Sequence, residues 1–205
     1  MLWKNNDIPY WRLSSFYFFY FAFVGSWVPF WNLYMEQHLG FSPEAIGYIA
    51  ALVLATKMLG PYLWGWLADY FGTRIPIVRV GSLLAFLSFL AVFWRQDFPA
   101  LLVIVALYSF FWNAVLSLFE VITLRHLREH THRYTQVRLW GSVGFVVAVA
   151  GLGALFDVVD IRWLPLVLAV ILAAIWLASL LVDEVPAEPR QVSVNHIALF
   201  WRELN

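Results

Sequence analysis

Residues 109–153 read SFFWNAVLSLFEVITLRHL, then REHTHRYTQ, then VRLWGSVGFVVAVAGLG. Two long apolar runs flank a short basic loop, which is the pattern of two antiparallel membrane helices. Glu120 lies near the end of the first run and Arg138 at the start of the second. Charged residues inside membrane helices are costly, so they are usually paired and functional. The antiparallel arrangement places both residues at similar depth and predicts an ion pair. The alternative is that both are interfacial charges that reach water.

The composition of the whole chain is that of a membrane protein. Of the 205 residues, 62% are hydrophobic and 13% are charged, and twelve are tryptophans. This is far too apolar for a soluble globular domain. No cysteine is present, which excludes disulfides, thiolate metal sites and cysteine nucleophiles. The net charge is zero, and no nucleic-acid partner is expected.

Six apolar runs are long enough to cross a lipid bilayer as helices. We expect them at about residues 13–35, 45–67, 75–94, 99–124, 138–156 and 163–182. The first run is too long for a signal peptide and has no small-residue cleavage site, so it should remain as a spanning helix. Residues 1–182 are therefore expected to form an all-α, six-helix transmembrane bundle. Residues 183–205 are expected to be a cytoplasmic linker, in which IALFWREL could form a short interfacial helix.

The basic residues predict the orientation of the chain. One set of loops and ends carries Lys4, Arg12, Arg74, Arg79, Arg125, Arg128, Arg133, Arg138, Arg190 and Arg202, whereas the other carries Arg95 and Arg162. Cytoplasmic loops are rich in lysine and arginine. Both termini are therefore expected in the cytoplasm, with the protein crossing the cell (inner) membrane an even number of times.

A short internal echo predicts two related three-helix units. The pattern G-x-L-x-D ends the second run, as Gly65, Leu67 and Asp69, and the fifth run, as Gly153, Leu155 and Asp157. One copy lies on the cytoplasmic side and the other on the opposite side, as two inverted repeats require. A match this short in an apolar chain can also arise by chance.

The stretch GWLADYFGTR (residues 65–74) resembles the loop signature between the second and third helices of the major facilitator superfamily. Gly65, Asp69, Gly72 and Arg74 occupy the matching positions, and the resemblance implies a gating role. Physically, Gly65 would allow a neighbouring helix to approach, Asp69 could contact an arginine or a helix terminus, and Gly72 could adopt a positive φ. The second basic residue usual in the signature is replaced by Ile75. The alternative is a plain solvated turn.

A narrower resemblance concerns VRLWGSVGF (residues 137–145) and Glu120. Together they resemble the phenylpropionate permease and lactose permease branch of proton-linked symporters, and residues 17–47 are similar to the first helix and following loop of the phenylpropionate permease. The resemblance implies that Glu120 and Arg138 bind solute and couple its movement to protons. Members of this superfamily have two six-helix halves, so the chain resembles the N-terminal half. A C-terminal half, or a second copy, is the expected partner.

Lys57 is a lysine within an apolar run. It lies about twelve residues into its helix, and hence about 18 Å deep, near the middle of the bilayer. No carboxylate of this chain is expected at that depth. Its partner should be an anionic solute, a residue of the other half, or nothing if burial neutralises the amine. The alternative is a lysine in a water-filled crevice with no ligand. The resemblance favours capture of an organic carboxylate.

Polar residues recur at helical spacing in the fourth run. Ser109, Asn113, Ser117 and Glu120 are expected on one face, directed at something other than lipid. They could line the solute path, with Asn113 as a contact. They could equally hold two helices together.

The first run and the basic loop supply further candidates. Trp27, Trp31 and Asn32 are expected on a similar inward-facing arc and could stack on the ring of a solute, although simple packing is the favoured interpretation. The loop histidines His126, His130 and His132 lie beside arginines and indicate a solvated basic loop rather than a metal site.

The sequence therefore predicts one half of a proton-coupled secondary transporter. Its partners would be the lipid bilayer, a proton and a small organic solute, with an aromatic or other organic carboxylate as the first candidate. The alternatives are a nucleoside or sugar symporter, and a truncated fragment or sensor that transports nothing. No covalent chemistry, cofactor or metal is expected, so the chain is not predicted to be an enzyme. An intramembrane serine protease is disfavoured because all five histidines fall in loops or the tail.

Overall fold

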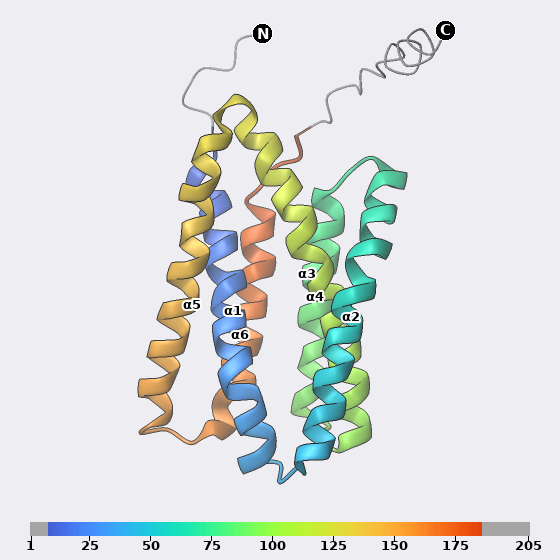
Figure 1. Cartoon of the computed structure of the whole chain (residues 1–205), viewed down its shortest axis with the longest axis vertical. Helices are drawn as coiled ribbons and strands as arrows, with labels where there is room; N and C mark the ends of the chain where they lie inside the picture. The colour runs from blue at the N-terminus through green and yellow to red at the C-terminus, as the bar shows by residue number, and fades with distance from the viewer. Residues whose placement is uncertain (1–7, 186–205) are drawn as a thin grey trace, which may run out of the picture.

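Six long helices joined by short connections make up the structure, a computed structural model that describes residues 8–185 (Figure 1). The helices are α1 (Tyr10–Gln37), α2 (Pro43–Phe71), α3 (Ile75–Leu90), α4 (Phe98–Leu127), α5 (Tyr134–Phe156) and α6 (Leu164–Leu180). Short 3-10 turns precede or follow them at Ala91–Phe93, Arg128–Arg133 and Ile161–Trp163. With these turns, all six are long and apolar enough to cross a membrane. The expected interfacial segment IALFWREL lies outside the described residues.

The ends of the helices follow local sequence signals. A proline occupies the first turn of four helices, at Pro43, Pro76, Pro99 and Pro165. Proline suits this position because its fixed φ is helical and its missing N–H would be unpaired there anyway. Ser42 caps α2 by accepting a hydrogen bond from the Ala45 N–H at 3.3 Å. Gly72 ends the same helix with a φ of 68°.

The packing of the helices repeats between the two halves of the chain. α1 packs on α5 and α6, α4 packs on α2 and α3, and α3 packs on α6. Exchanging α1–α3 for α4–α6 turns this set of pairs into itself. Because α1 and α4 run in opposite directions through the bundle (Figure 1), the repeat is inverted. The predicted fold class, an all-α bundle of two inverted three-helix repeats, is confirmed.

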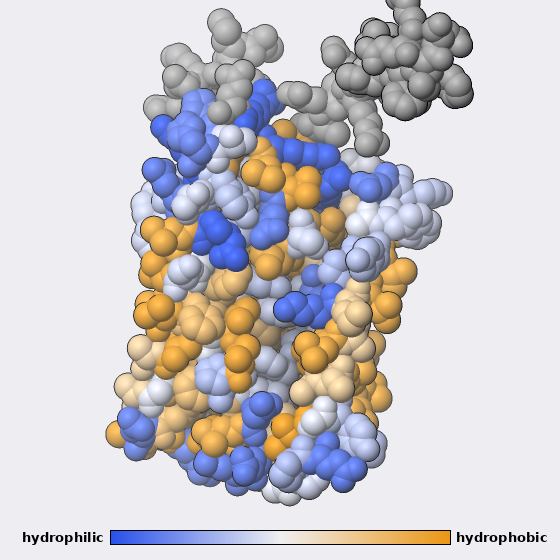
Figure 2. Space-filling model, viewed as in Figure 1, coloured by the Kyte–Doolittle hydropathy of each residue, from blue (hydrophilic) through white to orange (hydrophobic). Residues whose placement is uncertain are grey.

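Both ends of the described chain lie at the same end of the bundle, together with the α2–α3 and α4–α5 connections (Figure 1). This end carries Arg12, Arg74, Arg79, Arg125, Arg128 and Arg133, and Figure 2 shows hydrophilic residues concentrated there. The charge asymmetry that the sequence shows is thus an asymmetry between the two ends of the bundle.

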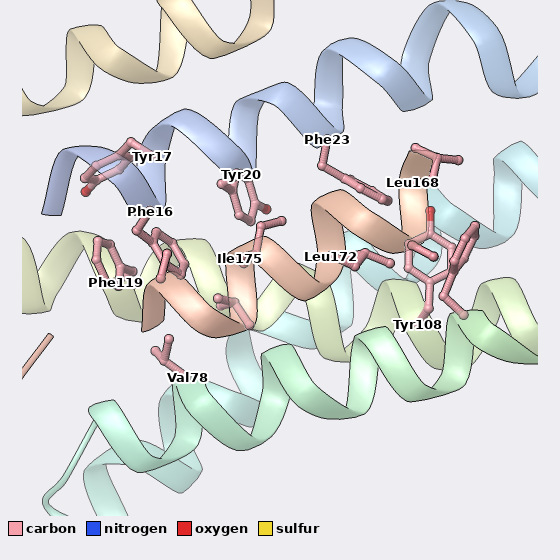
Figure 3. Packing of buried hydrophobic residues seen from close by; sticks show 14 of the residues in the cluster. Phe16, Tyr17, Tyr20, Phe23, Val78, Tyr108, Phe119, Leu168, Leu172 and Ile175 are labelled. Atoms are coloured by element: carbon pink, nitrogen blue, oxygen red, sulfur yellow. The ribbon is translucent and has the colours of Figure 1, made fainter. Parts of the chain in front are cut away.

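Aromatic side chains fill the centre between α1, α4 and α6 (Figure 3). The rings of Phe16 and Phe119 stack with their centroids 3.6 Å apart. The rings of Tyr20 and Trp112 stack with their centroids 4.5 Å apart and an angle of 4° between the ring planes. The Tyr17 hydroxyl donates a hydrogen bond of 3.1 Å to Thr123 Oγ1, so its polar end is satisfied inside the core. These contacts join α1 and α4 directly.

α5 approaches α1 through glycines on both helices. A Cβ at Gly25 would lie 2.7 Å from the carbonyl oxygen of Phe145, and a Cβ at Gly144 would overlap the carbonyl group of Phe18. Small residues allow membrane helices to approach at backbone distance, where van der Waals packing holds them together. The glycines therefore fix the position of α5 against α1.

Candidate functional site

Figure 1 looks onto the face along which α5, α1, α4 and α2 follow one another. Figure 2 shows the same face, and hydrophilic side chains interrupt its apolar surface between the two ends of the bundle. Polar groups at membrane depth are tolerated where they face water, protein or a ligand rather than lipid. This face is therefore the one on which we look for a solute-binding site.

Glu120 of α4 and Arg138 of α5 form an ion pair with 3.9 Å between Glu120 Oε1 and Arg138 Nε. The two side chains are 39% and 30% exposed, respectively. Their separation is too long for a hydrogen bond. The structure thus brings together the two charges that the sequence predicts to pair, but without a hydrogen bond between them.

Two aromatic rings of α1 hold the guanidinium of Arg138. Its Cζ atom lies 3.9 Å from the ring centroid of Phe21 and 5.5 Å from that of Tyr17. Both distances are within the range of cation–π attraction. Sequence reasoning missed these two residues, because rings are so frequent in residues 16–31 that none stood out.

The pair retains much of its hydrogen-bonding capacity. A guanidinium carries five N–H donors and a carboxylate about four lone-pair sites. Among the described residues, the hydroxyl of Tyr134 is a neighbour of the Arg138 guanidinium, and no hydrogen bond joins that guanidinium to Glu120. A solute that inserts between them could therefore donate to Glu120 and accept from Arg138.

The polar stripe on α4 divides into two parts. Ser109 Oγ lies 2.8 Å from Thr56 Oγ1 of α2, and Asn113 Nδ2 donates to the same Thr56 oxygen at 3.3 Å. Ser117 is exposed and donates to the carbonyl of Ala114 in its own helix at 3.2 Å. The N-terminal part of the stripe, Ser109 and Asn113, therefore connects α4 to α2, which is the second of the two expectations for it. Only Glu120 reaches across to α5.

Lys57 lies on α2 one residue after Thr56, and its side chain is exposed. Among residues 8–185, no acidic side chain forms an ion pair with it. Pro61, one turn later, has no N–H to donate to the Lys57 carbonyl. The amine therefore remains available to a group outside this bundle.

Trp27, Trp31 and Asn32 do not share one face, contrary to the expectation. Trp31 is buried in the core, where it stacks on Trp27 at 4.3 Å and on Tyr34 at 5.3 Å, whereas Asn32 is exposed. Consecutive helical residues point about 100° apart, and here that rotation takes Asn32 out of the core in which Trp31 lies. In this conformation Trp31 serves packing rather than contact with a solute.

The loop signature has the predicted turn and a defined ion pair. Arg74 Nη2 donates to Asp69 Oδ1 at 2.8 Å, and Gly72 has the expected positive φ. Gly65 does not serve a close approach among the described residues, because nothing lies within 4 Å of its Cβ position. Gly60, one turn and a half earlier, faces α4 instead, with Phe110 O 3.4 Å from its Cβ position.

Glu184 adds a contact that sequence reasoning missed. Its Oε2 accepts hydrogen bonds from the N–H groups of Arg74 at 2.9 Å and Ile75 at 2.6 Å. Its other oxygen lies 3.9 Å from Arg125 Nη1 of α4. A carboxylate at a helix N-terminus satisfies unpaired donors and complements the helix dipole. The segment after α6 is therefore fastened to the start of α3.

Comparison with known proteins identifies the family. Residues 10–198 match the family described as MFS_1 like. The chain belongs to the major facilitator superfamily. It is 36% identical to the maltose permease of Geobacillus stearothermophilus over 147 residues, which are 69% of this chain and 36% of that permease. It is 30% identical over 170 residues to a probable 3-phenylpropionic acid transporter of Escherichia coli (strain K12), covering 82% of this chain and 44% of that one. The predicted resemblance is confirmed.

The solved structures of this superfamily agree on the fold. The crystal structure of the nucleoside transporter NupG superposes with a TM-score of 0.78 at 19% identity, covering 95% of this chain and 51% of NupG. The chain spans about half the length of NupG and less than half of the two permeases above. It is thus a multi-pass membrane protein with the fold of half a major facilitator transporter.

Proposed function

We propose that this chain is the N-terminal half of a proton-coupled secondary transporter for a small organic solute. A second six-helix half, or a second copy of this chain, would complete the transport path in the cell (inner) membrane. Both termini and the basic end of the bundle would face the cytoplasm, following the bias of lysine and arginine. The observation that carries the proposal is the partly exposed Glu120–Arg138 pair with unused donors and acceptors.

Alternating access would rock this bundle against its partner around the pair. Glu120 is a carboxylate placed between the ends of a spanning helix, and it can exchange a proton for the interaction with Arg138. A solute hydroxyl or a proton would each compete with the guanidinium for the same oxygens. Such competition links the protonation of Glu120 to the binding of solute, which is what coupled transport requires.

An aromatic or other organic carboxylate is the first candidate solute, and Lys57 supports it. The Glu120–Arg138 pair carries no net charge, so by itself it gives an anion no net attraction. Lys57 adds one positive charge without a counter-ion among the described residues. One relative bears the name of a probable 3-phenylpropionic acid transporter, and 3-phenylpropionic acid is an aromatic carboxylic acid.

A neutral, hydroxyl-bearing solute, either a sugar or a nucleoside, is the second candidate. The pair offers acceptors on Glu120 and donors on Arg138 at once, and hydroxyl groups can use both. The maltose permease, the sucrose permease of Escherichia coli and the structural neighbour NupG bear the names of such solutes. In this case Lys57 would pair with the second half instead.

Uptake measurements with Lys57→Met separate the two candidates. The chain would be expressed with a six-helix C-terminal half from a relative, and uptake of 3-phenylpropionate, maltose and uridine measured in intact cells. Leu54→Met, exposed on the same helix, is the matched control. Loss of 3-phenylpropionate uptake in Lys57→Met alone supports the carboxylate. If Lys57→Met takes up 3-phenylpropionate as wild type does, the carboxylate is ruled out as the solute that Lys57 binds, and the neutral solute is favoured. If the wild-type chain expressed with the C-terminal half takes up none of the three solutes, the transporter proposal is contradicted for these solutes and a fragment or sensor is favoured.

A further inference from the structure

We propose that Phe21 and Gly141 are positioning residues for Arg138: Phe21 holds the guanidinium by its ring, and Gly141 provides the space in which guanidinium and ring meet. This inference rests on the proposed function, in which Arg138 contacts the solute. It assigns a role to two residues that do not themselves contact it.

The ring of Phe21 lies against the Arg138 guanidinium. The distance of 3.9 Å from Cζ to the ring centroid equals the distance that separates the guanidinium from the carboxylate of Glu120. At 3.9 Å the carboxylate pair is looser than a charge-assisted hydrogen bond, which is usually below 3 Å. The ring competes with Glu120 for the guanidinium and keeps the two charges from closing on each other. α1 therefore holds the guanidinium outside hydrogen-bonding distance of Glu120, so that a solute has less to displace.

Gly141 lies on α5 three residues after Arg138, so the two are neighbours on one side of the helix. A Cβ at Gly141 would lie 2.7 Å from Phe21 Cδ2 and 2.9 Å from Arg138 Nη1. Both distances are shorter than side-chain carbons tolerate. A side chain at position 141 would therefore occupy the space in which the ring and the guanidinium are in contact.

The atoms that this Cβ would meet are the ends of side chains rather than backbone. The Arg138 guanidinium can rotate away without moving α5, so Gly141→Ala should fold and displace the charge. Gly144 differs, because a Cβ there would meet the backbone of Phe18 and would force α1 and α5 apart. Gly151 is a neutral comparison on the same helix, with nothing within 4 Å of its Cβ position. The three glycines of α5 therefore separate a local displacement from a general loss of packing.

A first experiment reads the guanidinium directly in the full chain, independently of transport. Arginine is labelled with ¹⁵N, and the Nε–Hε resonance of Arg138 is assigned by its loss in Arg138→Lys. The ring of Phe21 should shift this resonance upfield. Phe21→Leu should remove the shift and Gly141→Ala should reduce it, whereas Phe21→Tyr and Gly151→Ala should keep it. A resonance that is the same in wild type, Phe21→Leu and Gly141→Ala overturns the inference.

A second experiment measures solute uptake with the C-terminal half present, normalised to the amount of protein in the membrane. A misplacement of a functional group by about 1 Å can lower the rate of the process that depends on it by up to about 10²-fold. We expect Gly141→Ala and Phe21→Leu to raise the KM about tenfold or more while the maximal rate per transporter stays close to that of wild type. Phe21→Tyr and Gly151→Ala should leave the KM unchanged.

The two proposals can fail separately. If Glu120→Gln and Arg138→Lys leave uptake normal, the proposed site is wrong. If these two variants abolish uptake while Gly141→Ala and Phe21→Leu keep the wild-type KM, only the positioning role is wrong. If Gly141→Ala fails to fold, the comparison of Phe21→Leu with Phe21→Tyr decides, and equal KM values in those two contradict the inference.

Discussion

The carboxylate of Glu120 and the guanidinium of Arg138 meet at 3.9 Å between α4 and α5, although α4 packs mainly on α2 and α3, and α5 mainly on α1. The pair thus bridges two helices that are otherwise held through their neighbours. A contact of this kind can open without disrupting the packed core. It is a suitable place for a solute to enter, because the cost of separating the charges is not added to a loss of helix packing.

Removing one member of the pair should destabilise the protein more than removing both. A fully buried charge left without its partner costs about 3–5 kcal/mol. Since water reaches both side chains here, we expect about 1 kcal/mol or less for Glu120→Gln or Arg138→Gln. The double variant should be closer to wild type in thermal unfolding, yet still inactive in transport. A double variant that unfolds at a lower temperature than both single variants would show that the two charges do not interact.

Gly144→Ala should be among the most damaging small substitutions in α5. Its methyl group would overlap the Phe18 carbonyl, and the helices would have to separate. Overpacking of this kind typically costs about 1–3 kcal/mol. Gly151→Ala and Gly153→Ala, which meet open space, should leave the unfolding temperature unchanged or raise it slightly. Equal stability of Gly144→Ala and Gly151→Ala would contradict the close α1–α5 approach.

The Asp69–Arg74 pair should matter for the transport cycle more than for binding. The side chain of Asp69 is 74% exposed, whereas that of Arg74 is 15% exposed, so water screens the pair from the Asp69 side and its contribution to stability is small. We expect Asp69→Asn to slow solute exchange between the two sides while the affinity for solute stays the same. Weakened binding with a normal exchange rate would argue against a gating role.

Glu184 should stabilise the start of α3. Replacing it with alanine leaves the N–H groups of Arg74 and Ile75 without their acceptor, and loss of such a cap typically costs about 1 kcal/mol. Asp183→Ala is the matched control, because Asp183 is 82% exposed and its contact with Arg12 is 3.5 Å. Hydrogen exchange of the first-turn amides of α3 should accelerate in Glu184→Ala alone. Equal exchange rates in the two variants would contradict the role of Glu184 as a cap of α3.

The topology can be tested with single cysteines, because the chain has none of its own. Cysteines at Thr131, in the α4–α5 connection, and at Gln37, at the end of α1, should react with a membrane-impermeant reagent from opposite sides of the membrane. Thr131 is expected to be reached from the cytoplasm. Labelling of both from one side would contradict the proposed orientation.

The sequence was sufficient for the fold because membrane helices leave a strong pattern. The apolar runs located all six helices, and G-x-L-x-D indicated the inverted repeat that the packing pairs confirm. α1, α2, α4 and α5 extend beyond the apolar runs, as at Tyr134 before Arg138, because polar residues continue a helix past the hydrocarbon core, whereas α3 and α6 end earlier than expected, at Leu90 and Leu180. The hydropathy of the sequence does not predict where a helix ends outside the hydrocarbon core.

The candidate site was only partly predictable. Glu120 and Arg138 stood out as charges in apolar helices, and their antiparallel helices implied similar depth. Phe21 and Gly141 could not be found in this way, because a ring among many rings and a glycine among several carry no signal until the helices are placed. Gly65 misled for the same reason: its sequence position matches a signature, but its side of α2 meets no neighbour among the described residues.

Proton-coupled uptake in Glu120→Gln tests the central claim most directly. Cells expressing this chain with a C-terminal half would be given solute in weakly buffered medium, and solute accumulation and alkalinisation of the medium would be recorded together. Val121→Ala, at the next and partly exposed position, is the control. We predict that wild type and Val121→Ala accumulate solute and alkalinise the medium, and that Glu120→Gln does neither at equal protein levels. Accumulation of solute by Glu120→Gln with normal alkalinisation would contradict the assignment of the Glu120–Arg138 pair as the solute and proton site.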